Sequence, residues 1–137
     1  MSKRRVVVTG LGLIAPVGNS VADGWKNVRE GISGITPIDQ WDVSAFSTRF
    51  AGTIRNFDIG QYLEPKEARK CDPFIHYGIA AACQALKDTG IQVKESEAHR
   101  IGVAIGSGIG GVSTIEANHS KWLEAGPRRI SPFFVPA

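Results

Sequence analysis

The chain has 137 residues, which is enough for one domain with a hydrophobic core. Its hydrophobic content of 42% and charged content of 21% are ordinary for a globular protein and exclude extensive disorder. The net charge of +3 is spread along the chain without long basic runs, so we expect no nucleic-acid partner.

The N-terminus superficially resembles a secretory signal, because basic residues 3–5 precede an apolar run at 6–18. That run is interrupted by Gly10, Gly12 and Pro16, and no small-residue cleavage site follows it. No apolar stretch reaches the ~18 residues of a membrane span. We therefore expect a mature cytoplasmic N-terminus and no membrane contact.

Residues 5–9 (Arg-Val-Val-Val-Thr) predict a buried strand that leads into a glycine turn. Asn19 or Ser20 then caps a helix that carries apolar residues at helical spacing and ends at Gly31. Turn-forming residues dominate residues 32–60, which we expect to run over the surface. The other predicted elements are a short strand at 50–54, a helix at 64–70 with Pro65 at its first position, a core helix at 74–89 capped by Asp72 and closed by Gly90, a buried strand at 100–105 and a helix at about 113–123.

The strand at 100–105 runs into Gly106-Ser107-Gly108-Ile109-Gly110-Gly111. Glycine at this density indicates positive φ angles or a backbone that something approaches closely. In α/β proteins, ligands bind beyond the carboxyl ends of strands, so this turn is the first candidate site.

Two glycine patterns, at 10–15 and 106–111, match the fingerprint of dinucleotide-binding folds. In the first, Pro16 and Gly18 stand where the phosphate-binding helix should begin, and no acidic residue follows a second strand at the expected ~20 spacing. In the second, the chain ends before a second strand can be seen. A nucleotide-binding domain is therefore only a lesser alternative.

The cysteines and histidines carry no recognisable site. Cys71 and Cys83 form neither a disulfide framework nor a zinc spacing, and we expect both to act as small buried hydrophobes in a reducing cell compartment. His76, His99 and His119 show no metal-binding spacing, so we expect no metal.

Five basic residues form two clusters. Lys66, Arg69 and Lys70 share one face of the predicted helix, and Arg128 and Arg129 form a second pair in a loop. The residues alone leave two readings open, a solvated surface and a site for an acidic partner.

Several blocks in order resemble the β-ketoacyl-acyl-carrier-protein synthases, and especially the elongating type II synthases of bacterial fatty-acid synthesis. The resemblance covers essentially all 137 residues. The blocks are Arg4 to Gly12, Pro16 to Asn19, Ser33 to Ile35, Phe74 to Gly78, Arg100 to Gly102, Gly106 to Gly111 and Gly126 to Pro136.

The resemblance implies an α/β, thiolase-like fold with αβαβα layers, assembled as a homodimer. It also implies a decarboxylative Claisen condensation. A cysteine nucleophile takes the acyl group from acyl-carrier protein, and two histidines assist decarboxylation of malonyl-carrier protein. A helix N-terminus stabilises such a thiolate, and backbone amides can hold the thioester oxyanion. No resident cofactor is implied, since phosphopantetheine arrives on the carrier protein.

The family's nucleophile and both histidines would lie beyond Ala137, and none of the cysteines or histidines present matches them. We therefore expect residues 1–137 to be the N-terminal part of a truncated domain that is inactive alone. Alternatives are a non-catalytic module that binds acyl chains or carrier protein, and a loading or chain-length-factor relative without the cysteine.

Two groups of residues carry over from the family by position. Ile109, next to Gly108, matches the gate of the acyl pocket, and Phe133 and Phe134 match an aromatic pair near that pocket and the dimer interface. The basic residues that match the family's docking surface for acyl-carrier protein are Lys66, Arg69, Lys70, Arg128 and Arg129.

Overall fold

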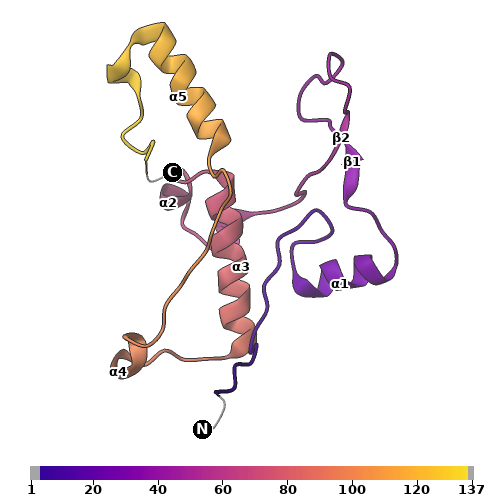
Figure 1. Ribbon diagram of the computed structural model, residues 1–137, viewed down its shortest axis with the longest axis vertical. Coiled ribbons are helices and arrows are strands. Elements are labelled where there is room, and N and C mark those ends of the chain that lie inside the picture. Colours follow the sequence, from indigo (N-terminus) through magenta and orange to yellow (C-terminus); the bar gives the residue numbers. More distant parts are fainter. Residues whose placement is uncertain (1–3, 136–137) are drawn as a thin grey trace. The chain divides into compact units, whose positions relative to one another are not determined.

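The computed structural model describes residues 4–135, whose backbone divides into two compact units. The first comprises the residues up to Asp58 together with Ala81–Ile91, and the second comprises Ile59–Ala80 and the residues from Gln92 onward. Helix α3 (Pro73–Thr89) gives its first turns to the second unit and its last turns to the first (Figure 1).

In the first unit, α1 (Val21–Arg29) begins where the sequence predicts a helix. Of the two predicted caps, Ser20 is the one that functions: its Oγ accepts a hydrogen bond from the amide of Asp23 at 3.1 Å. Asn19 instead donates its Nδ2 to the carbonyl of Arg55 at 2.8 Å. Gly31 follows the helix with a φ of +69°, the left-handed conformation that glycine adopts readily, so the predicted stop is confirmed.

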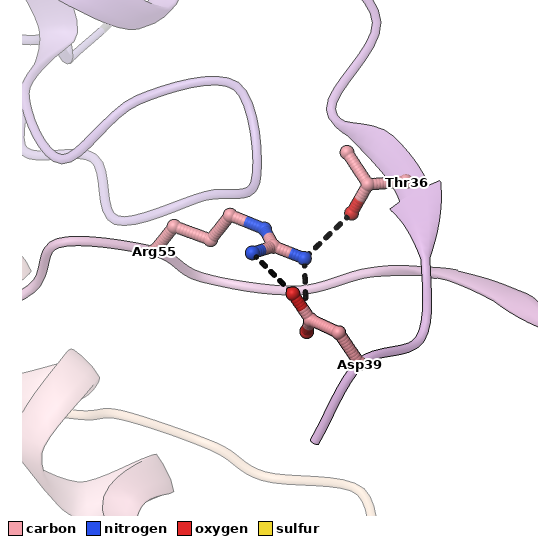
Figure 2. A network of polar contacts seen from close by, with 3 residues as sticks. All are labelled: Thr36, Asp39 and Arg55. Carbon is pink, nitrogen blue, oxygen red and sulfur yellow. Dashed lines mark hydrogen bonds and ion pairs between the residues drawn. The ribbon is translucent and has the colours of Figure 1, made fainter. Parts of the chain in front are cut away.

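A two-stranded antiparallel sheet follows, made of β1 (Ile35–Pro37) and β2 (Phe50–Gly52), with Thr36 opposite Ala51. The short strand predicted near residues 50–54 is therefore confirmed. Arg55, just after β2, binds both carboxylate oxygens of Asp39, at 3.0 and 3.1 Å, and the hydroxyl of Thr36 at 3.2 Å (Figure 2). This fork clamps the segment after β2 to β1 and to the residues that follow β1.

The glycines at 10 and 12 pack against the last turns of α3. A Cβ on Gly12 would collide with the backbone of Ala81, and one on Gly10 would collide with that of Ala85. These glycines therefore allow the close approach of two backbones.

The second unit is largely helical. The predicted helices at 64–70 and 113–123 are present as α2 (Pro65–Ala68) and α5 (Val112–Ala125), and Pro65 begins α2 as expected. Gly90 follows α3 with a φ of +64°, as predicted. The remaining elements are two 3₁₀ turns, η1 (Ile59–Gln61) and η2 (Pro127–Arg129), and the single-turn helix α4 (Glu95–Ala98).

The predicted buried strands at 5–9 and 100–105 do not form. Both segments lack strand pairing within residues 4–135, and their side chains are exposed, 89% for Val6 and 79% for Val103. A strand requires a hydrogen-bonded neighbour, which neither segment has here. Their β-branched composition is appropriate for a buried sheet, but that sheet is not assembled by the described residues.

The expectation that α3 is a fully buried core helix is also wrong for this chain. Within α3, Ala80 alone is buried, and Leu86 and Cys83 are exposed. An apolar helix becomes central only when other elements cover all of its faces. Within the described residues, none of the helices combines the length and apolarity needed to cross a membrane.

Candidate functional site

Two of the predicted docking cations border a hollow of about 320 Å³ in the second unit, here called the cationic hollow. Arg69 and Lys70 lie there because the chain continues to turn after α2, with the amide of Lys70 bonded to the carbonyl of Glu67 at 3.0 Å. Lys66 is exposed on α2 and does not line the hollow. The lining is Arg69 to Pro73 on one side, Ser113, Thr114, Ala117, Asn118 and Lys121 of α5 on the other, and Ser131 with Phe133.

The cations of the α2 turn are only lightly engaged within the chain. Lys70 makes an ion pair of 2.6 Å with Glu67, but both side chains are substantially exposed. Such surface pairs contribute roughly 0–1 kcal/mol, so an external anion can compete for the ammonium group. Arg69 donates its Nε to the carbonyl of Pro65 at 3.2 Å and is itself exposed.

The second predicted pair, Arg128 and Arg129, lies on η2 directly after α5. Gly126 makes the turn between α5 and η2 with a φ of +80°, and its amide donates a hydrogen bond to the carbonyl of Trp122 at 2.8 Å. Arg129 lines a further hollow of about 380 Å³ together with Lys121, Glu124 and Ala125.

Lys121 lines both hollows and so joins the two predicted cationic groups into one surface. The sequence shows no basic cluster around Lys121, because this residue stands alone in a helical pattern. A signal was nevertheless present: Thr114, Ala117, Asn118 and Lys121 recur at helical spacing, which places them on one face of α5. We call these six residues the docking surface, after the role that the sequence predicts for all of them but Lys121: Lys66, Arg69, Lys70, Lys121, Arg128 and Arg129.

Two buried polar residues, Asp72 and Asn118, also line the cationic hollow. The carboxylate of Asp72 accepts the amide of Thr114 at 3.1 Å, in the first turn of α5. The side chain of Asn118 donates to the carbonyl of Thr114 at 2.8 Å and accepts the amide of Ser131 at 2.7 Å. These bonds join the start of α3, helix α5 and the segment after η2.

The predicted gate residues are not brought together. Ile109 is 81% exposed on the glycine turn, whereas Phe133 lies at the cationic hollow and Phe134 is exposed. Within the turn, the amide of Gly110 bonds to the hydroxyl of Ser107 at 3.1 Å, and Gly110 has a φ of +75°.

Gly108 has no atom within 4 Å of where a Cβ would stand, so here it meets no close neighbour. The same holds for Gly106. The positive φ and the close contact predicted for this turn are confirmed at Gly110 and Gly111, since a Cβ on Gly111 would lie 2.6 Å from the Asp72 carboxylate.

An apolar hollow of about 440 Å³ lies beside the same turn. The first turns of α3 contribute Phe74, Ile75, Tyr77, Gly78 and Ile79, and the chain leading into the turn contributes Ile105, Gly106 and Ser107. The hollow is therefore formed by the end of the predicted strand 100–105, the start of the glycine turn and the first turns of the predicted core helix.

At the first glycine motif and just after the second, a carboxylate occupies one of the backbone amides that could bind a phosphate. Asp88 accepts the amide of Leu11 at 2.9 Å, and Asp72 accepts that of Thr114 at the start of α5. A helix N-terminus or glycine turn binds phosphate through free amides and positive potential, and a carboxylate removes both. The geometry therefore argues against the nucleotide-binding alternative.

The cysteines and histidines differ in their exposure. Cys71 is half-buried, whereas Cys83 is exposed, so the prediction of a buried hydrophobe is wrong for Cys83. The ring Nε2 of His76 lies 2.9 Å from the carbonyl of Ala68, and His99 and His119 are exposed. Among residues 4–135, no cluster of three or more histidine, cysteine, aspartate or glutamate side chains could hold a metal ion.

Comparison with known sequences identifies the family to which the chain belongs. Residues 3–137 match the family described as beta-ketoacyl synthase, N-terminal domain. The 3-oxoacyl-[acyl-carrier-protein] synthase 2 of Vibrio harveyi is 58% identical over all 137 residues, and that of Coxiella burnetii (strain RSA 493 / Nine Mile phase I) is 48% identical over 136. These matches include 100% and 99% of this chain, which spans 33% of the length of each relative.

Solved structures agree with the sequence matches. The chain is similar to the ishigamide ketosynthase/chain length factor, with a TM-score of 0.78 and 27% identity, over 98% of this chain and 34% of that one. It is similar to a ketosynthase in complex with its type II PKS acyl-carrier protein, with a TM-score of 0.79 and 30% identity, over 98% of this chain and 35% of that one. The predicted fold class, the N-terminal portion of a thiolase-like α/β fold, is confirmed, and the chain belongs to the β-ketoacyl synthase family.

Proposed function

We propose that residues 1–137 form the N-terminal portion of a β-ketoacyl-acyl-carrier-protein synthase of type II, which elongates fatty acids. The observation that carries this proposal is the 58% sequence identity, along the whole chain, to two proteins named 3-oxoacyl-[acyl-carrier-protein] synthase 2. That name also favours an elongating synthase over a chain-length factor.

In the proposed reaction, a cysteine outside these residues takes the acyl group from a carrier-protein thioester and releases the carrier thiol. Malonyl-carrier protein then loses carbon dioxide, and the resulting carbanion attacks the acyl-cysteine thioester. The new carbon–carbon bond gives β-ketoacyl-carrier protein, and the cysteine thiolate leaves. Residues 1–137 supply partner docking and part of the acyl pocket, and alone they do not catalyse the reaction.

The docking surface is proposed to bind acyl-carrier protein. The acidic residues that pair with these six cations or line the same hollows are Glu67, Asp72 and Glu124, so the surface keeps an excess of positive charge for an acidic partner. Charge complementarity of this kind raises the association rate and fixes orientation more than it raises affinity. The structurally similar ketosynthase solved with its carrier protein supports this assignment.

Ile109, flanked by Gly108, is proposed to gate the acyl chain, and Phe133 and Phe134 to line its pocket. The exposure of Ile109 supports the first part, because a gate must be free of fixed contacts with its own turn. We further propose that the full synthase is a cytoplasmic homodimer. Apolar cover from its other parts would bury the segments at 5–9 and 100–105.

A hybrid enzyme tests the proposed function. Residues 1–137 of this chain replace the matching third of the Vibrio harveyi synthase, and the purified hybrid is assayed with acyl- and malonyl-carrier protein. We expect condensing activity, none in the 137-residue chain alone, and none in a control hybrid whose nucleophilic cysteine is replaced by alanine. A folded hybrid without activity would overturn the proposal.

A further inference from the structure

Asp72 and Asn118 are buried polar residues of the described chain, with 7% and 5% of their surface exposed. Burying a polar side chain is unfavourable unless hydrogen bonds replace its contacts with water. Both residues meet this condition with backbone groups of α5 and, for Asn118, with the amide of Ser131. Their bonds therefore fix particular backbone segments in place.

Thr114 is the point where the two residues meet. Its amide is held by Asp72 at 3.1 Å, and its carbonyl is held by the Nδ2 of Asn118 at 2.8 Å. Because Asp72 immediately precedes α3, the first turn of α5 is anchored to the start of that helix. The side chain of Asn118 is therefore held on a helix whose first turn is anchored.

From that place, Asn118 reaches out of its helix to the segment that carries the two phenylalanines. Its Oδ1 accepts the amide of Ser131 at 2.7 Å, and the Oγ of Ser131 accepts the amide of Phe133 at 3.1 Å. Ser131 lies 13 residues beyond Asn118, so this is a tertiary contact and no part of the helix ladder. A hydrogen-bonded path therefore runs from α5 through the Asn118 side chain and Ser131 to the amide of Phe133.

We propose that Asn118 is a positioning residue that sets the discrimination between acyl chain lengths, by holding the segment 131–134 in place. The inference rests on the proposed function, since the phenylalanines matter for chain length only in a synthase. Asn118 does not touch the substrate in this scheme. It acts through Ser131 on Phe133 and Phe134.

The test uses the hybrid synthase with Asn118→Leu, which keeps the side-chain volume and removes both hydrogen bonds. We measure kcat/KM for a preferred and a rejected acyl chain length. The ratio of the two should fall about tenfold, because the partly buried backbone amide of Ser131 loses its hydrogen-bond partner, which favours release of the segment. A merely destabilising change lowers the amount of active enzyme and scales both values equally, so it leaves the ratio unchanged.

Two further variants sharpen the result. Ser120→Ala, at an exposed position of α5, is the matched control and should leave the ratio unchanged. Ser131→Ala keeps the backbone amide that Asn118 accepts and removes only the bond to Phe133, so it should produce a smaller change than Asn118→Leu. An equal or larger change in Ser131→Ala would transfer the role from Asn118 to the serine.

Hydrogen exchange of the backbone amides of Ser131, Phe133 and Phe134 gives a readout that does not require activity. Faster exchange in Asn118→Leu, with a flattened ratio, supports the proposal. Faster exchange with an unchanged ratio overturns the role in chain-length discrimination, and unchanged exchange overturns the positioning itself. An inactive parent hybrid counts against the proposed function, while the exchange measurement still decides whether Asn118 holds the segment.

Discussion

The carboxylate of Asp72 accepts the backbone amide of Thr114 at 3.1 Å across 42 residues of sequence. Thr114 lies in the first turn of α5, whose own N-cap residue is Gly111 and has no side chain to offer. A residue from another part of the chain thus performs the capping function that usually falls to a local serine, threonine or aspartate.

Gly111→Ala should break this cap. The added Cβ would lie 2.6 Å from the Oδ2 of Asp72, which is too close unless the carboxylate leaves Thr114. Loss of a helix cap costs about 1 kcal/mol, so exchange of the Thr114 amide should accelerate roughly fivefold. NMR-detected hydrogen exchange of the chain measures this. Gly106→Ala is the control, since a Cβ there meets nothing within 4 Å, and an equal effect of both substitutions would contradict the capping role.

Ile109→Phe in the hybrid synthase should shorten the longest acyl chain that is accepted. The side chain is exposed within these residues, so the larger ring does not disturb the chain's own packing. It should act instead by filling the proposed pocket, which one bulky residue is enough to close. Product lengths measured by mass spectrometry check this, with Ile109→Ala as the opposite change. Identical product profiles in both variants would contradict the gate assignment.

Local signals predicted most of the helix ends correctly. The cap at Ser20, the proline at the start of α2, and the glycines after α1 and α3 act within a few residues of their own position. Such signals work because the backbone groups they satisfy are near in sequence.

Non-local features escaped prediction, or were predicted without their partners. The segments at 5–9 and 100–105 have the composition of buried strands, but a strand exists only with a neighbour, and composition does not name one. Likewise, Asp72 is recognisable as a cap next to Pro73, yet nothing local indicates that its carboxylate binds Thr114. The cationic residues were identified in two groups, and only the fold shows that Lys121 lies between them.

Replacing Arg128 and Arg129 by glutamate in the hybrid should raise the KM for acyl-carrier protein roughly tenfold and leave kcat nearly unchanged, because charge at a docking surface acts on encounter and orientation. Lys121→Glu should act in the same direction. Its effect should be less than additive with that of Arg129, since the two residues line one hollow. The differences should shrink as salt is added.

Lys87→Glu provides the control for this series. Lys87 is exposed on α3 and lines neither the cationic hollow nor the hollow beside Arg129. Its substitution nevertheless changes the net charge of the protein by the same amount as Lys121→Glu. Steady-state kinetics with varied carrier protein measure both. A rise in KM of equal size for Lys87→Glu would show that net charge alone causes the effect, and would contradict the docking surface.

The fork between Arg55 and Asp39 makes the hairpin of β1 and β2 sensitive to acid (Figure 2). The hydrogen bonds and charge of Arg55 lower the pKa of Asp39 below its ordinary value of 3.8. A carboxyl whose pKa is lower in the folded state stabilises that state above its unfolded pKa and loses this contribution as the pH falls through the folded pKa. The hairpin should therefore keep its clamp at neutral pH and loosen below 3.8.

Arg55→Gln should raise the pKa of Asp39 toward its ordinary value, because the amide keeps a hydrogen-bond donor but removes the charge. Titration of the Asp39 carboxyl carbon by NMR checks the shift. Asp42 is the internal control: its pKa is also lowered, but by hydrogen bonds from Ser44, so it should not respond to the loss of Arg55. An unchanged Asp39 titration in Arg55→Gln would show that the fork does not persist in solution, and the acid sensitivity of the hairpin would then need another source.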